Sequence, residues 1–438
     1  MTTFDPTVST KFLKLLVSGL ECAIKLHPGS DTLSLWRSLA DGSLPFLSVL
    51  DYVRSLPAKL HYLTLDTTGV CDLTCPAMCY YHPDISLNRQ PISLELQKRA
   101  IRDAASELAL SNLVFAGKEP LLNVQRLQEL CSFAATLPNR HFQIGLVTNG
   151  RHVLKNIKVL EALVDGGVLN FVDVSIDSAN RQQHDEIRGR SGTFELAVDA
   201  LRRLSTDGRI RISSSSVLRA DNSAGILALI QQYSQTWKNY FVTPIQPPIF
   251  SPSPPLKWEL IHDFLTSLRS QLIGSRVSVE VMISVVGIYL HDAIQAGWLK
   301  IDQIHEDESG QIYAPVTAGN SRILLHIQLL PETAHRIARI TYAGDYLPNS
   351  HFLQAARPEQ FAIGNLNDTR LVELYRRSIQ DDGVLAKLYS SRDNHDCRSQ
   401  PCWSTCFGGI SATEHSMVAG IPLHRRPHLC YKLNPDGA

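Results

Sequence analysis

A short apolar segment leads directly into a cysteine-rich loop: Tyr62-Leu63-Thr64-Leu65-Asp66-Thr67-Thr68 is followed, after two residues, by Cys71-Asp72-Leu73-Thr74-Cys75-Pro76-Ala77-Met78-Cys79. The apolar and β-branched segment is typical of a buried strand, so the three thiols are expected in a loop at a strand end. Soft sulfur ligands suit a metal ion or an iron–sulfur cluster. Three cysteines ligate only three irons of a four-iron cluster, so the fourth iron would be open to a group that is not protein.

Two other interpretations of this loop stay open on these residues alone. A structural zinc site takes four ligands, commonly from paired C-x2-C units, and His82 is close enough in sequence to be the fourth. The thiols could also be redox-active or simply buried. The downstream sequence has to decide between these chemistries.

The composition is that of an ordinary globular protein. The 438 residues allow two or three domains with a sizeable core, and 44% of them are apolar. The 42 Lys and Arg balance the 42 Asp and Glu, so no net field favours nucleic acid or an acidic membrane. The longest apolar run, 277–290, is interrupted by Glu280 and is too short to span a bilayer. We therefore expect neither a nucleic-acid nor a membrane partner.

The nine cysteines indicate the compartment. Seven of them fall in two clusters, which favours metal ligation in a reducing environment over a disulfide framework. Cys22 and Cys131 stand alone in helical patterns and are expected to be small buried apolar groups. Residues 1–29 carry no small-residue cleavage site, so no signal peptide is predicted and the expected location is cytoplasmic.

Strands and helices are predicted to alternate over residues 61–250, after a helical N-terminal cap at 1–60. Parallel strands with crossover helices make either a barrel or an open doubly wound sheet, and in both the working residues lie beyond the strand C-termini. The expected strands are 62–68, 112–116, 143–148, 171–176, 210–217 and 240–245. Expected helices include 94–108, 124–135 and 193–204.

The C-terminal third does not continue the alternation of predicted strands and helices. A proline-rich segment, Pro247–Pro255, predicts a domain boundary, and residues 251–320 are expected to form a linker and helical region that includes a helix at 256–273. In the last predicted domain, 321–438, residues 323–330 and 336–342 look like a hairpin. Four further thiols follow at spacings too irregular for a zinc ribbon: Cys397, Cys402, Cys406 and Cys430.

Polar motifs follow the predicted strands in a recognisable order. They are Gly117-Lys118-Glu119-Pro120, Leu146-Val147-Thr148-Asn149-Gly150, Val174-Ser175-Ile176-Asp177-Ser178 and His184-Asp185-Glu186-Ile187-Arg188-Gly189. With the cysteine loop, this ordered set resembles the radical S-adenosylmethionine (radical SAM) enzymes. The resemblance implies an α/β fold, a partial (β/α)6 TIM-like barrel. It also implies a [4Fe–4S] cluster with an open site on Cys71, Cys75 and Cys79, at which adenosylmethionine is reductively cleaved to a 5′-deoxyadenosyl radical.

The resemblance also implies roles for side chains at the strand ends. Glu119 is suited to accept the methionine ammonium and Arg188 to pair with its carboxylate. Around the ribose and the methionine the candidates are Thr148, Asn149, Ser175 and Asp177, and no catalytic side chain is assigned beyond the cluster. Two features depart from the family pattern. The gap between Cys75 and Cys79 is one residue longer than usual, and Lys118 stands where the family has glycine, where it could crowd the methionine or add a cation.

The C-terminal part resembles the SPASM or shorter twitch extension, which binds auxiliary iron–sulfur clusters. The matching segments are 362–366, 371–375 and Cys402-x3-Cys406 with Gly408-Gly409. Thiols are missing at 347–349 and at Asn394, so one auxiliary [4Fe–4S] cluster on Cys397, Cys402, Cys406 and Cys430 is expected rather than two. A zinc site made by the same four residues is the alternative.

Many relatives with this extension modify ribosomally made peptides, so the expected reaction is cross-linking, epimerisation or oxidation of a peptide. The expected partner is an external one-electron donor such as flavodoxin or ferredoxin. The alternatives are dehydrogenation of a small molecule, such as a sugar or amino-sugar, and a degenerate homologue that only binds. The bond changed is not encoded in any motif.

Overall fold

The computed structural model describes most of residues 57–406. The gaps are 77–78, 80, 82–89, 139, 246–255, 301–302, 307–311, 329–335, 381–382, 394 and 401, and single described positions are 43, 45, 47, 54, 417, 418, 420 and 430. The predicted helical cap therefore lies almost entirely outside the described residues. So do Cys22, His82, Asn394, Gly408-Gly409 and the proline-rich boundary.

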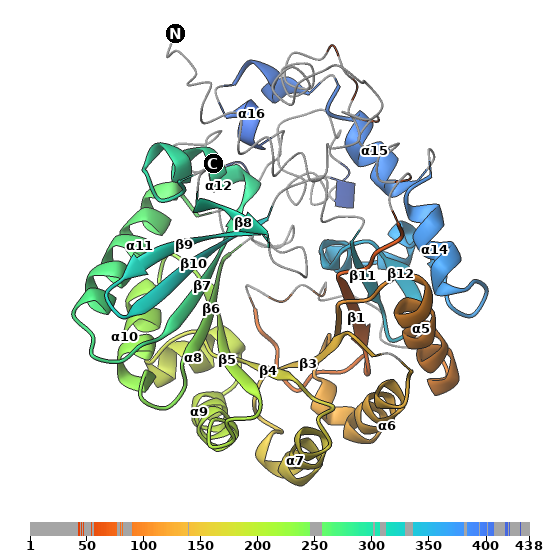
Figure 1. The fold of residues 1–438 in the computed structure, drawn as a ribbon, viewed down its shortest axis with the longest axis horizontal. Coiled ribbons are helices and arrows are strands. Elements are labelled where there is room, and N and C mark those ends of the chain that lie inside the picture. Colours follow the sequence, from red (N-terminus) through yellow and green to blue (C-terminus); the bar gives the residue numbers. More distant parts are fainter. Residues whose placement is uncertain are drawn as a thin grey trace.

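One sheet of 13 strands organises the described chain, in the order β13-β12-β11-β1-β2-β3-β4-β5-β6-β7-β10-β9-β8. Within the run from β11 through β1–β7 to β10 every neighbouring pair is parallel, whereas β12, β13, β9 and β8 are joined by antiparallel pairs. The sheet curves strongly but does not close, and the helices lie on its outer side (Figure 1). The predicted partial TIM-like barrel is confirmed.

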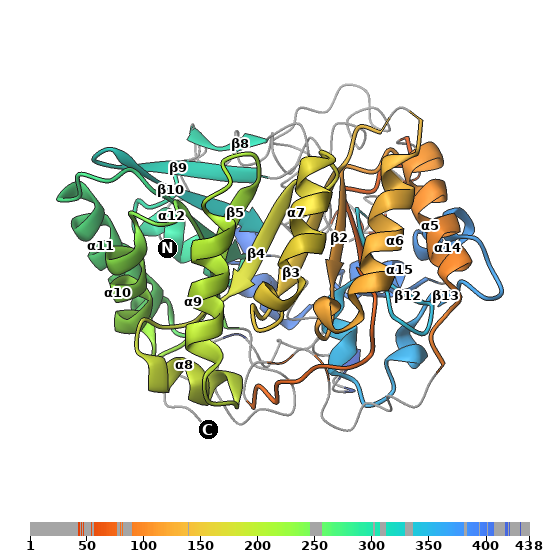
Figure 2. The same cartoon turned by 90° about the horizontal axis from the view of Figure 1, so that it is seen from below.

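The six predicted strands are all present, with bounds within two residues of the prediction. They are β1 Tyr62–Asp66, β2 Asn112–Ala116, β3 Gln143–Thr148, β4 Phe171–Ser175, β5 Arg211–Leu218 and β6 Asn239–Pro244. The crossover helices are α5 Leu94–Glu107, α6 Val124–Ala135, α7 Ile157–Asp165, α8 Arg181–Arg188, α9 Thr193–Leu204, α10 Ser223–Tyr233 and α11 Trp258–Ile273. Figure 2 shows α6, α7 and α9 next to one another on the outer face.

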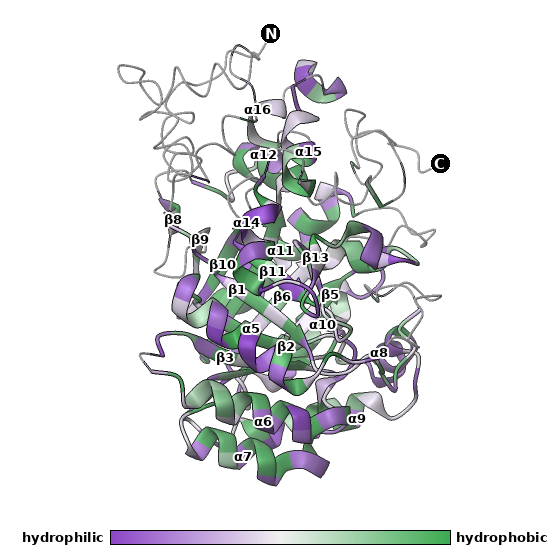
Figure 3. Ribbon diagram, turned by 90° about the vertical axis from the view of Figure 1, so that its right-hand side faces the viewer, coloured by the Kyte–Doolittle hydropathy of each residue, from purple (hydrophilic) through white to green (hydrophobic). Residues whose placement is uncertain are grey.

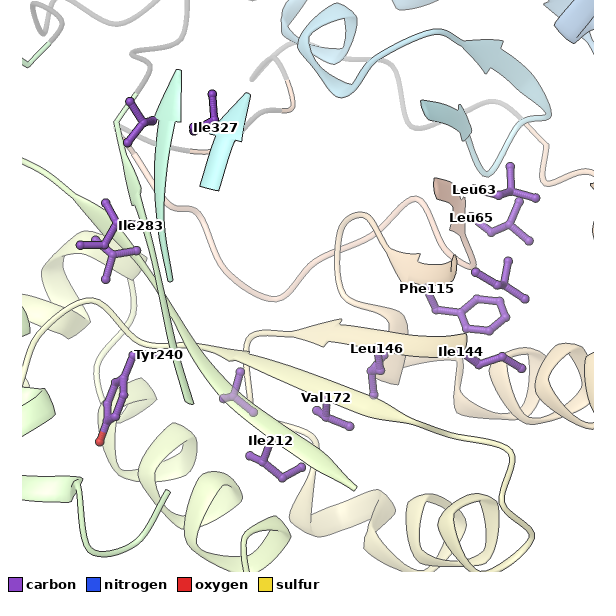
Figure 4. Packing of buried hydrophobic residues seen from close by; sticks show 14 of the residues in the cluster. Leu63, Leu65, Phe115, Ile144, Leu146, Val172, Ile212, Tyr240, Ile283 and Ile327 are labelled. Carbon is purple, nitrogen blue, oxygen red and sulfur yellow. The ribbon is translucent and has the colours of Figure 1, made fainter. Parts of the chain in front are cut away.

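Amphipathic helices and apolar strands make the core. The helices carry apolar residues on one side and polar residues on the other (Figure 3). Between them and the sheet pack fully buried side chains such as Leu65, Phe115, Ile144 and Val172 (Figure 4). Each such side chain contributes roughly 1.5–3 kcal/mol by leaving water. Cys131, on α6, is fully buried, as predicted for a small apolar group.

Both ends of the sheet are extended by the C-terminal third. At one end lie β7 Glu280–Val286, β8 His305–Glu306, β9 Ile312–Ala318 and β10 Ser321–Gln328, together with α12 Gly287–Gln295. At the other end lie β11 Ile337–Ile340, β12 Asp345–Leu347 and β13 Gly364–Asn365. The sheet thus continues across the boundaries predicted at 250 and 320.

The predicted hairpin between 323–330 and 336–342 is wrong. β10 pairs with β7 and β9, whereas β11 pairs with β1 at the opposite end of the sheet. Both strands are apolar, and an apolar pattern identifies a strand without identifying its partner. The ambiguous segment 277–290 is also resolved, because β7 ends at Val286 and α12 begins at the next residue.

Short elements complete the chain beyond β12. They are η4 Ser350–Gln354, η5 Pro358–Phe361, α14 Leu371–Ser378, α15 Val384–Ser390, η6 Asp396–Ser399 and α16 Trp403–Cys406. α14 packs against α5, and α16 packs against both α12 and η6. Among the described residues no helix is long and apolar enough to cross a membrane.

Candidate active site

The first cysteine group lies in the loop after β1, and its three thiols are half-buried. Burial raises the pKa of the Cys71 thiol to about 11, against the backbone N–H of Leu73, which donates to its Sγ (3.5 Å). Burial also raises the pKa of Cys75. The neighbouring thiols add to these shifts, Cys75 to that of Cys71 and Cys79 to that of Cys75. Without a metal Cys71 and Cys75 are protonated at neutral pH, and ligation would release their protons.

Glu119 follows β2 and connects the loops after three neighbouring strands. Its carboxylate accepts hydrogen bonds from Thr148 Oγ1 (2.7 Å), the Asn149 N–H (2.8 Å) and the Leu121 N–H (3.1 Å). Its own N–H donates to the carbonyl of Val70, beside the cysteine loop (3.1 Å). The side chain is fully buried, which raises its pKa, while these donors act against the shift. Glu119 and Thr148 are therefore in contact, and the hydrogen bonds of Glu119 connect the loops after β1, β2 and β3 to one another.

Asn149, at the end of β3, reaches the cysteine loop directly. Its Nδ2 lies 4.0 Å from Cys71 Sγ and donates to Asp72 Oδ1 (3.0 Å). Asp72 also accepts from Arg151 Nε (2.7 Å) and lies 3.1 Å from His152 Nε2. These contacts attach the start of the loop to the end of β3.

Asp177 and Arg188 form a buried ion pair below the second thiol. Arg188 Nε donates to Asp177 Oδ2 (2.7 Å), and the guanidinium also contacts the Cys75 thiol. The Asp177 N–H donates to His184 Nδ1 (3.1 Å), and its Oδ1 accepts from the Val217 N–H (2.9 Å). Burial lowers the pKa of His184 to about 4, so the imidazole is neutral. A cation beside a thiol favours its thiolate form, which a metal requires.

The other strand-end residues make fewer contacts with the cysteine loop. Ser175 is half-buried at the end of β4, opposite Ser215 of β5. Gly189 adopts φ +70° after α8, and a Cβ there would lie 2.6 Å from Thr74 Oγ1. Thr74 Oγ1 in turn donates to the Gly189 carbonyl (3.2 Å), so α8 ends against the cysteine loop. Lys118 leans on the Tyr81 ring, its Nζ 4.4 Å from the ring centroid.

The second cysteine group gathers around α12 and α16. Cys397 and Cys406 are buried, and Cys402 and Cys430 are half-buried. The Cys406 N–H donates to the Cys402 carbonyl (2.9 Å), and Cys430 is near enough to Tyr289 of α12 to raise its pKa.

Aromatic rings surround this second group. His395 stacks on Trp403 with ring centroids 5.4 Å apart, and the Cys397 N–H donates to His395 Nδ1 (3.1 Å). Cys397 lies on η6, and Cys402 and Cys406 lie at the start and end of the α16 turn, which contacts both η6 and α12; Cys430 lies near Tyr289 of α12.

The donor set of the loop fits an iron–sulfur cluster. Thiolates bound to iron are stabilised by N–H donors, which are provided here by Leu73 in the loop, Asn149 after β3 and Arg188 of α8. Within the described part of the chain, no group of three or more His, Cys, Asp and Glu side chains is assembled that could hold a single metal ion.

Sequence reasoning missed the residues that support this site. The cysteine loop is attached to the end of β3 through contacts of Asp72 with Arg151 and His152. The only sequence signal for these three residues was that they lie close to Cys71 or Asn149 in the chain. Arg339 and Tyr81 meet at Asp66 from distant parts of the chain, and no motif indicated that contact.

Comparisons with known proteins agree with this arrangement. The family model described as the Radical SAM superfamily matches residues 65–219, which include the cysteine loop and the four strand-end motifs. Comparison with the curated proteins finds no significant match.

Solved structures show the same fold over nearly the whole chain. Streptococcus suis SuiB bound to its precursor peptide SuiA is 14% identical with a TM-score of 0.63, covering 97% of this chain and 89% of that one. SuiB bound to S-adenosylmethionine gives a TM-score of 0.61 at 15% identity, with the same coverage. Native anSMEcpe with AdoMet and the Cp18Cys peptide gives 0.55 at 16% identity, covering 85% of this chain and 95% of that one. Residues 65–219 thus form a domain of the radical SAM superfamily, and the fold around it is similar to those of SuiB and anSMEcpe.

Proposed function

We propose that this protein is a peptide-modifying radical SAM enzyme that cleaves adenosylmethionine at a [4Fe–4S] cluster held by Cys71, Cys75 and Cys79. The observation that carries the proposal is the meeting of three thiols with Asn149 and Arg188 at the carboxyl ends of the strands. When bound, the cluster supplies the electron that splits adenosylmethionine to methionine and a 5′-deoxyadenosyl radical. The protein holds the thiols, excludes water and orients the ligand.

Different strand-end side chains would bind different parts of adenosylmethionine. Arg188, already beside Cys75, is proposed to bind the methionine carboxylate, and Asp177 to hold its guanidinium in place. Asn149 and Ser175 are proposed for the ribose and methionine. Glu119 is more enclosed than the motif implied, because its carboxylate is fully buried and accepts three hydrogen bonds. An ammonium would meet it at Oε2, and Thr148 would act through Glu119.

A peptide is the favoured substrate. Support comes from two similar structures that are complexes with peptides, SuiB with SuiA and anSMEcpe with Cp18Cys, although their low identity establishes likeness of fold alone. The SPASM-like extension and an auxiliary [4Fe–4S] cluster on Cys397, Cys402, Cys406 and Cys430 are part of this proposal. In it, the second cluster is fully ligated and relays electrons.

The proposed electron donor is an acidic one-electron carrier such as flavodoxin or ferredoxin. Exposed apolar side chains lie on the segments that follow β1, β2 and β3: Val70 is 50% exposed, Leu122 38% and Leu154 39%. Lys155 and Lys158 are exposed and close to Leu154 in sequence. Exposed apolar and basic side chains on these segments suit a negatively charged partner that must approach the loop cluster.

The proposal is tested on the anaerobically reconstituted protein. With dithionite and adenosylmethionine it should release 5′-deoxyadenosine, and co-expression with candidate precursor peptides should give a product of altered mass. Release of 5′-deoxyadenosine only with small sugars or amino-sugars would transfer the assignment to a small-molecule dehydrogenase. A bound cluster without any cleavage would leave a binding protein.

A further inference from the structure

Four side chains behind the cysteine loop form a buried charged group, here called the clamp. Asp66 ends β1, Tyr81 follows Cys79 by two residues, Lys118 follows β2, and Arg339 lies in β11. Asp66, Tyr81 and Arg339 are between 2% and 9% exposed. The clamp therefore joins three strands to the far end of the loop.

Its contacts are short and mutually consistent. The Tyr81 hydroxyl donates to Asp66 Oδ2 (2.5 Å), and Arg339 Nη2 donates to Asp66 Oδ1 (2.6 Å) and to the Tyr81 oxygen (3.0 Å). Lys118 Nζ lies over the Tyr81 ring at 4.4 Å, a cation–π geometry. The Lys118 ammonium therefore contacts the face of the phenol ring whose hydroxyl group binds Asp66.

The clamp carries two cations and one carboxylate. Burial raises the pKa of Asp66, and Arg339, Tyr81 and Lys118 all act against that shift. Asp66 is the anion of a buried ion pair with Arg339 (2.6 Å), so Lys118 adds one positive charge in excess. Gly117 has φ +117°, and a Cβ there would lie 2.6 Å from Asp66 Oδ1, so the turn that presents Lys118 is folded tightly around the carboxylate.

The segment after β11 contacts both ends of the cysteine loop. Tyr81 packs with Leu347 and Phe352, and Cys79 lies against this small apolar cluster. At the start of the loop, a Cβ at Gly69 would come within 2.6 Å of the Tyr342 ring. The position of the third thiol therefore depends on the clamp and on the chain around β11.

We propose that Lys118 is a positioning residue that, through Tyr81, fixes the end of the loop at Cys79 and places a positive charge beside the loop cluster, making that cluster easier to reduce. The inference depends on the proposed function, because it assumes a [4Fe–4S] cluster on this loop. Reduction adds one electron to the cluster and breaks no bond. A nearby cation favours the more negative reduced state, so the lysine at the family's glycine position has a defined electrostatic effect.

The test compares three variants of the full-length reconstituted protein. Lys118→Met removes the charge and keeps the length, Lys118→Arg keeps both the charge and the ring contact, and Lys300→Met is the matched control at an exposed lysine before β8. The readouts are iron retained per chain and the redox titration of the EPR signal that changes on addition of adenosylmethionine. In Lys118→Met the ratio of reduced to oxidised loop cluster at a fixed potential should fall by about tenfold, from the loss of one nearby charge. Lys118→Arg and Lys300→Met should retain the wild-type ratio.

Each outcome decides the matter. A wild-type ratio and wild-type iron in Lys118→Met would overturn the inference, as would an equal fall in Lys300→Met. If Lys118→Met retains no iron, Lys118→Arg decides: restored iron supports the clamp, and continued loss overturns it. A wild-type protein that binds no cluster would instead defeat the proposed function.

Discussion

The two cysteine groups of this molecule have opposite surroundings. Cys71, Cys75 and Cys79 lie among charged and polar side chains at the strand ends, including Asn149 and Arg188. The C-terminal group lies among aromatic rings, with His395 stacked on Trp403 and Tyr289 near Cys430. Three thiols with polar neighbours suit a cluster that also binds a ligand. Four thiols with aromatic neighbours suit a closed cluster that only carries electrons.

Replacing the cysteines of either group should show which role belongs to which group. These replacements are expected to have the largest effects. The wild-type protein should hold about eight irons, four for each cluster. Replacing Cys71, Cys75 and Cys79 by Ala should leave about four irons and abolish adenosylmethionine cleavage. Replacing Cys397, Cys402, Cys406 and Cys430 should also leave about four irons, but with cleavage retained and peptide modification lost. Anaerobic reconstitution, elemental analysis and 5′-deoxyadenosine assay measure all of these.

Elemental analysis also gives the contrary results. About four irons plus one zinc in the wild type would make the C-terminal group a zinc site, which cannot relay electrons because zinc does not change oxidation state. No iron at all in the first triple variant would mean that the auxiliary cluster does not exist. Cleavage that survives in that variant would remove the loop from the active site.

A pH response should distinguish the two groups in the iron-free protein, because His184 supports only the first. Its pKa is about 4 in the folded chain against 6.5 for the free side chain. A lowered pKa gives stability that is fully present above about pH 6.5 and is lost as the pH falls through about 4. The difference between these two pKa values corresponds to a loss of about 3 kcal/mol in the free energy of unfolding.

The measurement is urea unfolding of the apo-protein from pH 7 to pH 4. His184→Gln should flatten the decline in unfolding free energy, and His141→Gln, at an exposed position, should not. Parallel curves for wild type and His184→Gln would show that the imidazole does not support the Asp177 backbone as the structure indicates.

The ion pair below the first group should control ligand affinity. In Asp177→Asn the Arg188 guanidinium loses its anionic partner, and a charge-assisted hydrogen bond is worth about 1.5–3 kcal/mol. We expect adenosylmethionine affinity to fall at least about tenfold while iron content stays at the wild-type value. Isothermal titration measures the affinity. Asp207→Asn, which disrupts an exposed pair with Arg209 before β5, is the matched control. An unchanged dissociation constant would make the Asp177–Arg188 pair purely structural.

The contrast between the regions also explains how far the sequence could be interpreted. Thiols and polar motifs at strand ends were predictable, because the carboxyl ends of parallel strands converge whatever the loops contain. The contacts of Glu119 with Thr148 and Asn149 follow from that rule. The pairing of Asp66 with Arg339 does not, because the residues are 273 positions apart and β11 was expected in a hairpin with β10. Local pattern identifies strands, but their partners are set by the global packing of the sheet.

The smallest expected effect concerns how electrons reach the first group. If an acidic carrier docks beside Val70, Leu122 and Leu154, then the exposed Lys155 and Lys158 accelerate its approach by electrostatic attraction. Lys155→Glu with Lys158→Glu should therefore slow reduction of the loop cluster by flavodoxin hydroquinone several-fold at low salt. Saturating dithionite should still reduce it to the same final extent. In this step the flavin hydroquinone gives one electron and becomes a semiquinone.

The salt dependence makes this prediction specific. Steering between exposed charges is screened as ionic strength rises, so the difference between wild type and the double variant should shrink toward zero near 1 M salt. Stopped-flow absorbance follows the reaction. Lys300→Glu combined with Lys238→Glu, at exposed lysines that precede β8 and β6, matches the change of net charge. Equal rates at low salt would place the carrier elsewhere. A weakened peptide affinity with unchanged reduction by flavodoxin would assign this face to the substrate, and electrons would then have to enter from another side, with the aromatic-lined C-terminal group as the next candidate.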